Sequence, residues 1–303
     1  MRMADTLNVC TYNVWFMPPL ITLFAHRFGV NLSPRKQTRA ALIAESVPEN
    51  LDIVVLCEAF CQKATNTLCK SLEARHGLKY RTQVLGRKGL GKLLSGGVVV
   101  VSKRPIIETD ELVFGQVYAR DDGLANKGVL YAKIAMDNDS GSTGSRRHAH
   151  VFATHTQAWD TPNCKAARAK QMEMVRDFIK SKAIPQDELV LVVGDLNVPR
   201  ETEEYEVMLT ILDATNPNLT DLTNPSFNHI TNYLASGGPS SGGSSTTLDY
   251  ILVSKGHLQP LEATAETISL KAKSKYPLKG KEVDDLSDHY PVIATIKLPS
   301  QGT

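Results

Sequence analysis

The 303-residue chain has 42% hydrophobic and 22% charged residues, a composition typical of folded globular proteins that excludes disorder for most of its length. With 34 Lys and Arg against 32 Asp and Glu, the formal net charge is +2, so no overall positive field indicates a nucleic-acid binder. The five cysteines are an odd number, which excludes a scaffold in which every cysteine is paired within the chain.

The start of the chain leads directly into an apolar run, without the basic and apolar regions of a signal peptide. No apolar run reaches the ~18 residues needed to cross a bilayer. We therefore expect a cytoplasmic protein or one bound peripherally to a membrane, and a secreted one if a leader preceded residue 1.

Short apolar runs rich in β-branched residues predict strands along the whole chain, at 7–14, 53–56, 98–101, 129–134, 151–154, 189–193, 248–253 and 292–296. A helix is predicted from a Ser33-Pro34 start to Pro48, and another over 166–182, where apolar residues recur every three or four positions. Scattered strands with irregularly interspersed helices favour an α/β sandwich of two sheets over a βαβ repeat.

Two stretches rich in glycine and serine, 137–145 and 236–245, predict mobile surface loops. Neither is flanked by a shift in composition that would divide the chain. We therefore expect one domain over residues 1–303.

Polar side chains suited to metal binding or proton transfer recur where the predicted strands begin or end. They are Asn13, Glu58, His155, Asp195, Asn197, Asp249, Asp288 and His289. A single carboxylate after a strand is usually only the start of a polar loop. Because the ends of adjacent strands converge in an α/β protein, the repeated pattern predicts one shared site.

The chemistry of this set is hard and rich in oxygen, with no cysteine among the candidate ligands. It suits Mg²⁺, which takes one or two carboxylates and keeps several waters, better than Zn²⁺. Two histidines add a general base and a general acid near neutral pH. The combination predicts hydrolysis of a phosphate ester by attack of water.

Six motifs in chain order resemble those of the endonuclease/exonuclease/phosphatase superfamily. They are Thr11-Tyr12-Asn13, Leu56-Cys57-Glu58, Thr154-His155, Gly194-Asp195-Leu196-Asn197, Leu248-Asp249-Tyr250-Ile251 and Ser287-Asp288-His289-Tyr290-Pro291-Val292. The resemblance implies a deoxyribonuclease-I-like fold, which is a four-layer α/β sandwich of two packed, mainly antiparallel sheets flanked by helices.

The resemblance also implies a metal site. Glu58, assisted by Asn13, would hold Mg²⁺, with Mn²⁺ or Co²⁺ as substitutes, and Asp288 would complete the surroundings of the metal and the histidine.

The same resemblance assigns catalytic roles. His289 would be the general base that activates water, and Asp249 would orient it. Asp195 and Asn197 would bind and polarise the phosphate and the nucleophile. His155 would support the developing charge or protonate the leaving oxygen.

The substrate follows from three further stretches, 96–106, 124–134 and 154–158, which resemble bacterial neutral sphingomyelinases. This resemblance implies hydrolysis of sphingomyelin, or a related choline phospholipid, by a monomer at a bilayer surface without nucleic acid. The alternatives are a nuclease or a glycerophospholipid phospholipase C of the same superfamily, and an inactive lipid-binding homologue. Lys127 is either a phosphate contact or an ordinary lysine at the start of a strand.

The chain departs from the secreted bacterial enzymes in two places. Cys164 has no partner in 118–123 for their disulfide, and the stretch equivalent to their aromatic-tipped hairpin, 270–286, has five lysines and only Tyr276 as an aromatic. Membrane contact is therefore expected from 15–24, which the prolines would hold as a loop. Trp15, Phe16 and Phe24 of this loop would enter the bilayer, the alternative being that they pack against a neighbouring element.

Overall fold

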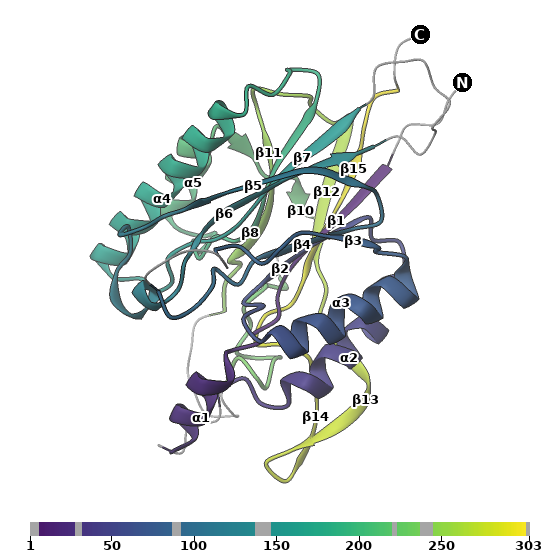
Figure 1. Cartoon of the computed structure of the whole chain (residues 1–303), viewed down its shortest axis with the longest axis vertical. Coiled ribbons are helices and arrows are strands. Elements are labelled where there is room, and N and C mark those ends of the chain that lie inside the picture. The colour runs from purple at the N-terminus through teal and green to yellow at the C-terminus, as the bar shows by residue number, and fades with distance from the viewer. Residues whose placement is uncertain are drawn as a thin grey trace.

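The computed structural model describes residues 6–27, 32–86, 92–136, 147–219, 223–236 and 245–300. Within these ranges two β-sheets pack face to face, and helices cover their outer faces (Figure 1). Of the two predicted mobile loops, 137–145 lies outside the described residues, as does 236–245 apart from its first and last residue.

The first sheet has, over the described residues, the strand order β10 (Asn218–Leu219), β12 (Glu262–Thr267), β15 (Val292–Lys297), β1 (Thr6–Asn13), β2 (Ile53–Cys57), β4 (Val99–Ser102) and β3 (Tyr80–Arg81). The second has the order β5 (Ile106–Val113), β6 (Gly128–Ala135), β7 (His148–His155), β8 (Leu189–Asp195), β11 (Asp249–Ser254) and β9 (Ala214–Thr215). Only the β1–β2, β10–β12 and β7–β8 pairs of these sheets are parallel, so the predicted mainly antiparallel pairing is confirmed for the described strands.

Helices form the outer layers. They are α2 (Lys36–Ser46), α3 (Gln62–His76), α4 (Pro162–Ser181) and α5 (Glu203–Leu212), whereas α1 (Pro19–Arg27) lies at one end of the molecule and a short 3₁₀ turn, η1, spans Arg120–Leu124. One apolar cluster joins α2 and α3 to the first sheet, a second joins α4 and α5 to the second sheet, and a third fills the space between the sheets. These layers confirm the predicted four-layer sandwich.

Strand β8 shows why this architecture follows from the sequence. Leu191 and Val193 point to the space between the sheets, while Val190 and Val192 pack under α4 and α5. A strand buried on both faces needs apolar residues at every position, and each such side chain contributes ~1.5–3 kcal/mol when fully buried.

Two predicted details of the N-terminal region are wrong. The second helix begins at Lys36, because Ser33 does not cap it; its hydroxyl instead bonds with the backbone of Trp15 and Met17. The segment predicted as a loop contains α1, whose first residue is Pro19. Proline fits the first turn of a helix, where no N–H donor is required, so the prolines here mark a helix start.

Gly194 explains the glycine of the Gly-Asp-Leu-Asn motif. Its φ is 149°, and a Cβ placed on it would lie 1.8 Å from the backbone oxygen of Thr154 on β7. Only glycine allows β7 and β8 to come this close immediately before Asp195.

The β13–β14 hairpin (Lys271–Leu278 and Lys281–Asp285) stands outside both sheets. Tyr276, Leu278 and Val283 are buried in a small cluster with Leu234. In Figure 1 the hairpin and α1 both lie at the end of the molecule away from the start of β1.

All five cysteines are free and buried. Among the helices that the structure describes, none has the length and hydrophobicity needed to cross a bilayer.

Candidate active site

The predicted site residues come together at one edge of the two sheets. Asn13 ends β1, His155 ends β7, Asp195 ends β8, and Glu58 follows β2 directly. Asp249 begins β11, which runs antiparallel to β8, so the register places it opposite Asp195.

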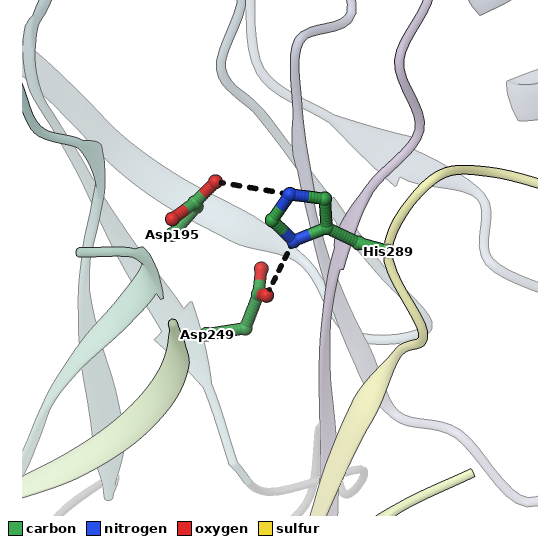
Figure 2. A group of neighbouring side chains, drawn as sticks. All are labelled: Asp195, Asp249 and His289. Atoms are coloured by element: carbon green, nitrogen blue, oxygen red, sulfur yellow. Dashed lines mark hydrogen bonds and ion pairs between the residues drawn. The ribbon is translucent and has the colours of Figure 1, made fainter. Parts of the chain in front are cut away.

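His289 lies between two aspartates, as Figure 2 shows. Its Nδ1 is 2.8 Å from Oδ2 of Asp249, and its Nε2 is 3.9 Å from Oδ2 of Asp195. The hydroxyl of Ser226 donates to the same oxygen of Asp249 at 2.7 Å. The imidazole orientation is therefore fixed from the Asp249 side, with Nε2 turned toward Asp195.

The electrostatics of His289 follow from this geometry. Burial by itself lowers the pKa of the imidazole, but the charges of Asp249, Asp195 and Asp288 outweigh it and raise the pKa to about 10. The ring therefore binds a proton at neutral pH unless a positive charge lies nearby.

Glu58 lies among other acidic groups. Burial, and then the charge of Asp288, raises the pKa of its carboxyl to about 7, with Asp195 acting in the same direction. Burial also raises the pKa of Asp288. The Oε2 atom of Glu58 is buried without a hydrogen-bond partner among the described residues. Carboxylates that repel one another, with one buried and unsatisfied oxygen, fit a bound cation.

Asn13 links Glu58 to Asp195. Its Nδ2 donates to Oδ2 of Asp195 at 3.0 Å, and its Oδ1 accepts from the backbone N–H of Trp15, also at 3.0 Å. The side chain is almost completely buried and therefore held in one orientation.

A second arrangement could also hold a metal ion. One ligand atom from each of Asp195, Asp249 and His289 lies within 4.8 Å of the other two. The imidazole of His289, however, is already hydrogen-bonded to Asp249. Mg²⁺ also prefers oxygen ligands such as those of Glu58.

His155 faces a lysine. The ammonium of Lys127 lies 3.4 Å from Nε2 of His155, 2.7 Å from the backbone oxygen of Thr156 and 2.9 Å from Oδ2 of Asp122. Burial, and then the charge of Lys127, lowers the pKa of His155 to about 3, so the ring is neutral. An ammonium can only donate, so Nε2 accepts and the proton resides on Nδ1, which is buried without a partner among the described residues.

The ammonium of Lys127 lies within hydrogen-bond distance of three acceptors. Its three contacts account for the three donors of the ammonium, so a direct phosphate contact would require one of them to be replaced. Asn197 supports Asp195: its backbone N–H donates to Oδ1 of Asp195 at 3.0 Å, and its Nδ2 donates to the oxygen of Thr156 at 3.2 Å.

Arg39 is a residue that the sequence analysis missed. Its guanidinium is fully buried and donates to the backbone oxygens of Val14 at 2.9 Å and Leu286 at 2.7 Å. It therefore ties the segment after Asn13 to the segment before Asp288. In the sequence, the feature that could have indicated this role is the position of the arginine directly before the apolar stripe of α2.

The residues predicted to enter the membrane fall into different environments. The side chain of Phe24 is 64% exposed on α1, and Trp15 is half-buried. Phe16 is 0% exposed and packs in the cluster beneath α2, with its ring 5.3 Å from Arg39, so its predicted membrane contact is wrong. Leu23, which lies within the predicted segment 15–24, is 60% exposed beside Phe24.

The fold and the site together define a deoxyribonuclease-I-like sandwich with an acidic, histidine-containing centre at its strand ends. Residues 10–289 match the sequence profile of the Endonuclease/Exonuclease/phosphatase family. The chain belongs to this family.

Several relatives have known names. Sphingomyelinase C of Bacillus cereus is 35% identical, over 97% of this chain and 90% of the relative. Sphingomyelinase C 2 of Leptospira interrogans is 34% identical over 94% of this chain, which spans 45% of that relative. A solved structure of a Staphylococcus aureus beta toxin mutant with bound magnesium ions superposes with a TM-score of 0.81 at 30% identity, covering 96% of this chain and 99% of the other.

Proposed function

We propose that this chain is a magnesium-dependent phosphodiesterase that hydrolyses sphingomyelin to ceramide and phosphocholine. The observation that carries the proposal is His289, held by Asp249 and turned toward Asp195, beside the unsatisfied Oε2 of Glu58. The names of the relatives support sphingomyelin as the substrate.

Glu58, with Asp288 and Asn13 beside it, would hold the Mg²⁺. When bound, the ion supplies positive charge that polarises a phosphate oxygen. Mn²⁺ or Co²⁺ could take its place, since both accept oxygen ligands.

His289 would take the proton from the attacking water at Nε2, while Asp249 holds the opposite side of the ring. A positive charge near Glu58 favours the neutral, basic form of this imidazole, which the surrounding carboxylates otherwise keep protonated. Asp195, oriented by Asn13 and Asn197, would align the water for in-line attack on phosphorus.

His155 would stabilise charge on the phosphate or on the leaving oxygen of ceramide. Because its pKa is low, the ring is neutral and can donate a hydrogen bond through Nδ1, but it has no extra proton to transfer. Lys127 adds a positive charge beside Nε2. Of the two roles implied by the resemblance, support of developing charge fits this environment better.

Assaying the protein on several substrates tests the proposal directly. Purified protein should release phosphocholine from sphingomyelin vesicles in Mg²⁺, stop when a chelator is added, and recover when Mg²⁺ is restored. Faster hydrolysis of phosphatidylcholine, or cleavage of DNA, would instead favour a glycerophospholipid phospholipase C or a nuclease. Vesicle binding without turnover of any substrate would identify an inactive lipid-binding homologue.

The enzyme would reach its substrate as a peripheral protein. Leu23 and Phe24 project from α1, which begins six residues after Asn13, and together they offer apolar surface close to the site. The side chains of Tyr276, Leu278 and Val283 in the β13–β14 hairpin, by contrast, are buried. We therefore assign the first bilayer contact to α1.

Replacing Leu23 and Phe24 with serine should weaken binding to sphingomyelin vesicles by at least about tenfold, because two large apolar side chains no longer leave water. Hydrolysis of vesicle lipid should fall with binding, while hydrolysis of a soluble chromogenic phosphodiester stays unchanged. Leu261→Ser, which alters a 67% exposed leucine at the opposite end of the molecule, is the matched control. Equal losses on both substrates would contradict the assignment.

A further inference from the structure

A second group of exposed apolar side chains lies beside the active site, where the segment before β4 meets the loops at the end of the second sheet. Leu93, Tyr118, Leu124 and Trp159 are between 40% and 82% exposed, and each lies on a loop at the catalytic end of the strands. We call these four residues the second rim, since α1 occupies the first-sheet side.

The three loops of the second rim are joined to one another by hydrogen bonds. The backbone N–H of Leu94 donates to the oxygen of Leu124 at 3.0 Å. The N–H of Ala119 donates to the side chain of Gln157, and the N–H of Ala158 to Asp122, both at 2.7 Å. The exposed side chains are therefore carried by a connected framework.

Buried polar groups hold this framework in place. Arg168 is 0% exposed, forms two hydrogen bonds with Glu204 at 2.7 and 2.8 Å, and donates to the backbone oxygen of Trp159 at 2.7 Å. Trp159 has a φ of 73°, a strained left-handed conformation for a large residue. The surrounding structure thus keeps a tryptophan ring in solvent although this strains the backbone. Packing of the core does not require an exposed ring at this position.

The second rim is connected to the catalytic centre. Asp122, which accepts from the loop before Trp159, also binds the ammonium of Lys127, and Lys127 contacts His155. A lipid phosphate bound between His155 and His289 would therefore have α1 on one side and the second rim on the other.

The residue types identify the kind of partner. Tryptophan and tyrosine favour the bilayer–water interface, where one part of the ring is buried and the other stays hydrated. Lys92 lies with its ammonium 4.2 Å from the centroid of the Tyr118 ring, so a cation that can pair with lipid phosphate accompanies the aromatic ring. A protein partner has no corresponding reason to bind over the catalytic centre of an enzyme whose substrate is a bilayer lipid.

We propose that the second rim enters the interfacial layer of a phospholipid bilayer, so that the enzyme docks on both sides of its active site. This inference rests on the proposed function for the nature of the substrate. The buried side chains of the β13–β14 hairpin cannot contact the bilayer. The inference assigns this contact to the three linked loops in addition to α1.

Fluorescence offers a direct test, because the chain has two tryptophans and Trp15→Phe leaves Trp159 as the sole tryptophan. On addition of sphingomyelin–phosphatidylcholine vesicles, the emission of Trp159 should shift to shorter wavelength, and brominated lipids should quench it. An unchanged spectrum with full access to iodide, under conditions where the protein sediments with the vesicles, would overturn the proposal.

A variant supplies the second measurement. Leu124→Ser/Trp159→Ser should bind the vesicles at least about tenfold more weakly and hydrolyse a soluble chromogenic phosphodiester at the wild-type rate. Ile107→Ser, which changes a 52% exposed residue at the far end of the same sheet, is the control. Equal loss on vesicles and soluble substrate, or no loss on vesicles, would reject the second rim.

The experiments can reject the proposed substrate and the proposed bilayer contact of the second rim independently of each other. If the wild-type protein does not hydrolyse sphingomyelin but Trp159 still enters the bilayer, the substrate assignment is wrong and the second rim stands. If sphingomyelin is hydrolysed while Trp159 stays in water, the opposite holds.

Discussion

Replacing His289 with alanine is expected to lower the turnover of sphingomyelin by at least ~10²-fold, the usual cost of losing a general base. The physical reason is that both His155 and His289 turn Nε2 toward Asp195, but among the described histidines only His289 does so with its opposite ring nitrogen held by a carboxylate. The measurement is steady-state release of phosphocholine at saturating Mg²⁺. Vesicle binding should be unchanged, because α1 and the second rim are left intact.

Two further variants make the result interpretable. His289→Asn keeps a donor for Asp249 and protects the fold if the alanine variant is unstable. His257→Ala removes a histidine that bonds with Ser254 at the opposite end of β11 and should keep full activity. A loss below tenfold in a folded His289 variant would transfer the role of base to another residue.

Replacing Glu58 with glutamine is expected to abolish magnesium-dependent turnover without unfolding the protein. The substitution keeps the shape of the side chain but removes the charge that the cation requires. It also removes the repulsion between Glu58 and Asp288, so the metal-free variant should be at least as stable as the wild type.

Thermal unfolding provides a readout that does not depend on catalysis. Mg²⁺ should raise the Tm of the wild-type protein, because a ligand that binds only the folded state stabilises it, and should leave the Tm of Glu58→Gln unchanged. Glu73→Gln, on the α3 helix that follows Glu58, is a control for loss of a carboxylate. A Glu58→Gln protein with wild-type turnover at low millimolar Mg²⁺ would place the ion at Asp195, Asp249 and His289 instead.

The elements predicted correctly from the sequence are those in which local pattern and tertiary burial agree. β8 is apolar at every position because helices cover one face and the other sheet covers the opposite one. The strand β12 (Glu262–Thr267) was not predicted from the sequence, because alanine is the only apolar residue type in it. β5 was missed because its central residues are polar and exposed, as an edge strand allows.

The site was predictable where the functional groups sit directly at strand ends, as Asn13, Asp195 and His155 do. The residues that hold them could not be found in this way. Arg39 acts through backbone oxygens, one of them at Leu286, 247 positions away, and Asp122 reaches His155 through Lys127. Local periodicity carries no information about such contacts, because they exist only after the sheets have packed.

The pairing of β1 with β15 has a consequence for how the protein acquires activity. Thr6 is in register with Lys297, and the hydroxyl of Ser287 donates to the backbone oxygen of Asn13, 274 residues away. Contacts at such separation form slowly, since a very long loop must close before they contribute. On a ribosome, β1 can pair with β2 early, but almost all of the described chain must be synthesised before its other neighbour, β15, emerges. A nascent or truncated chain would lack both Asp288 and His289, so catalytic competence arises only when the two ends of the fold have joined.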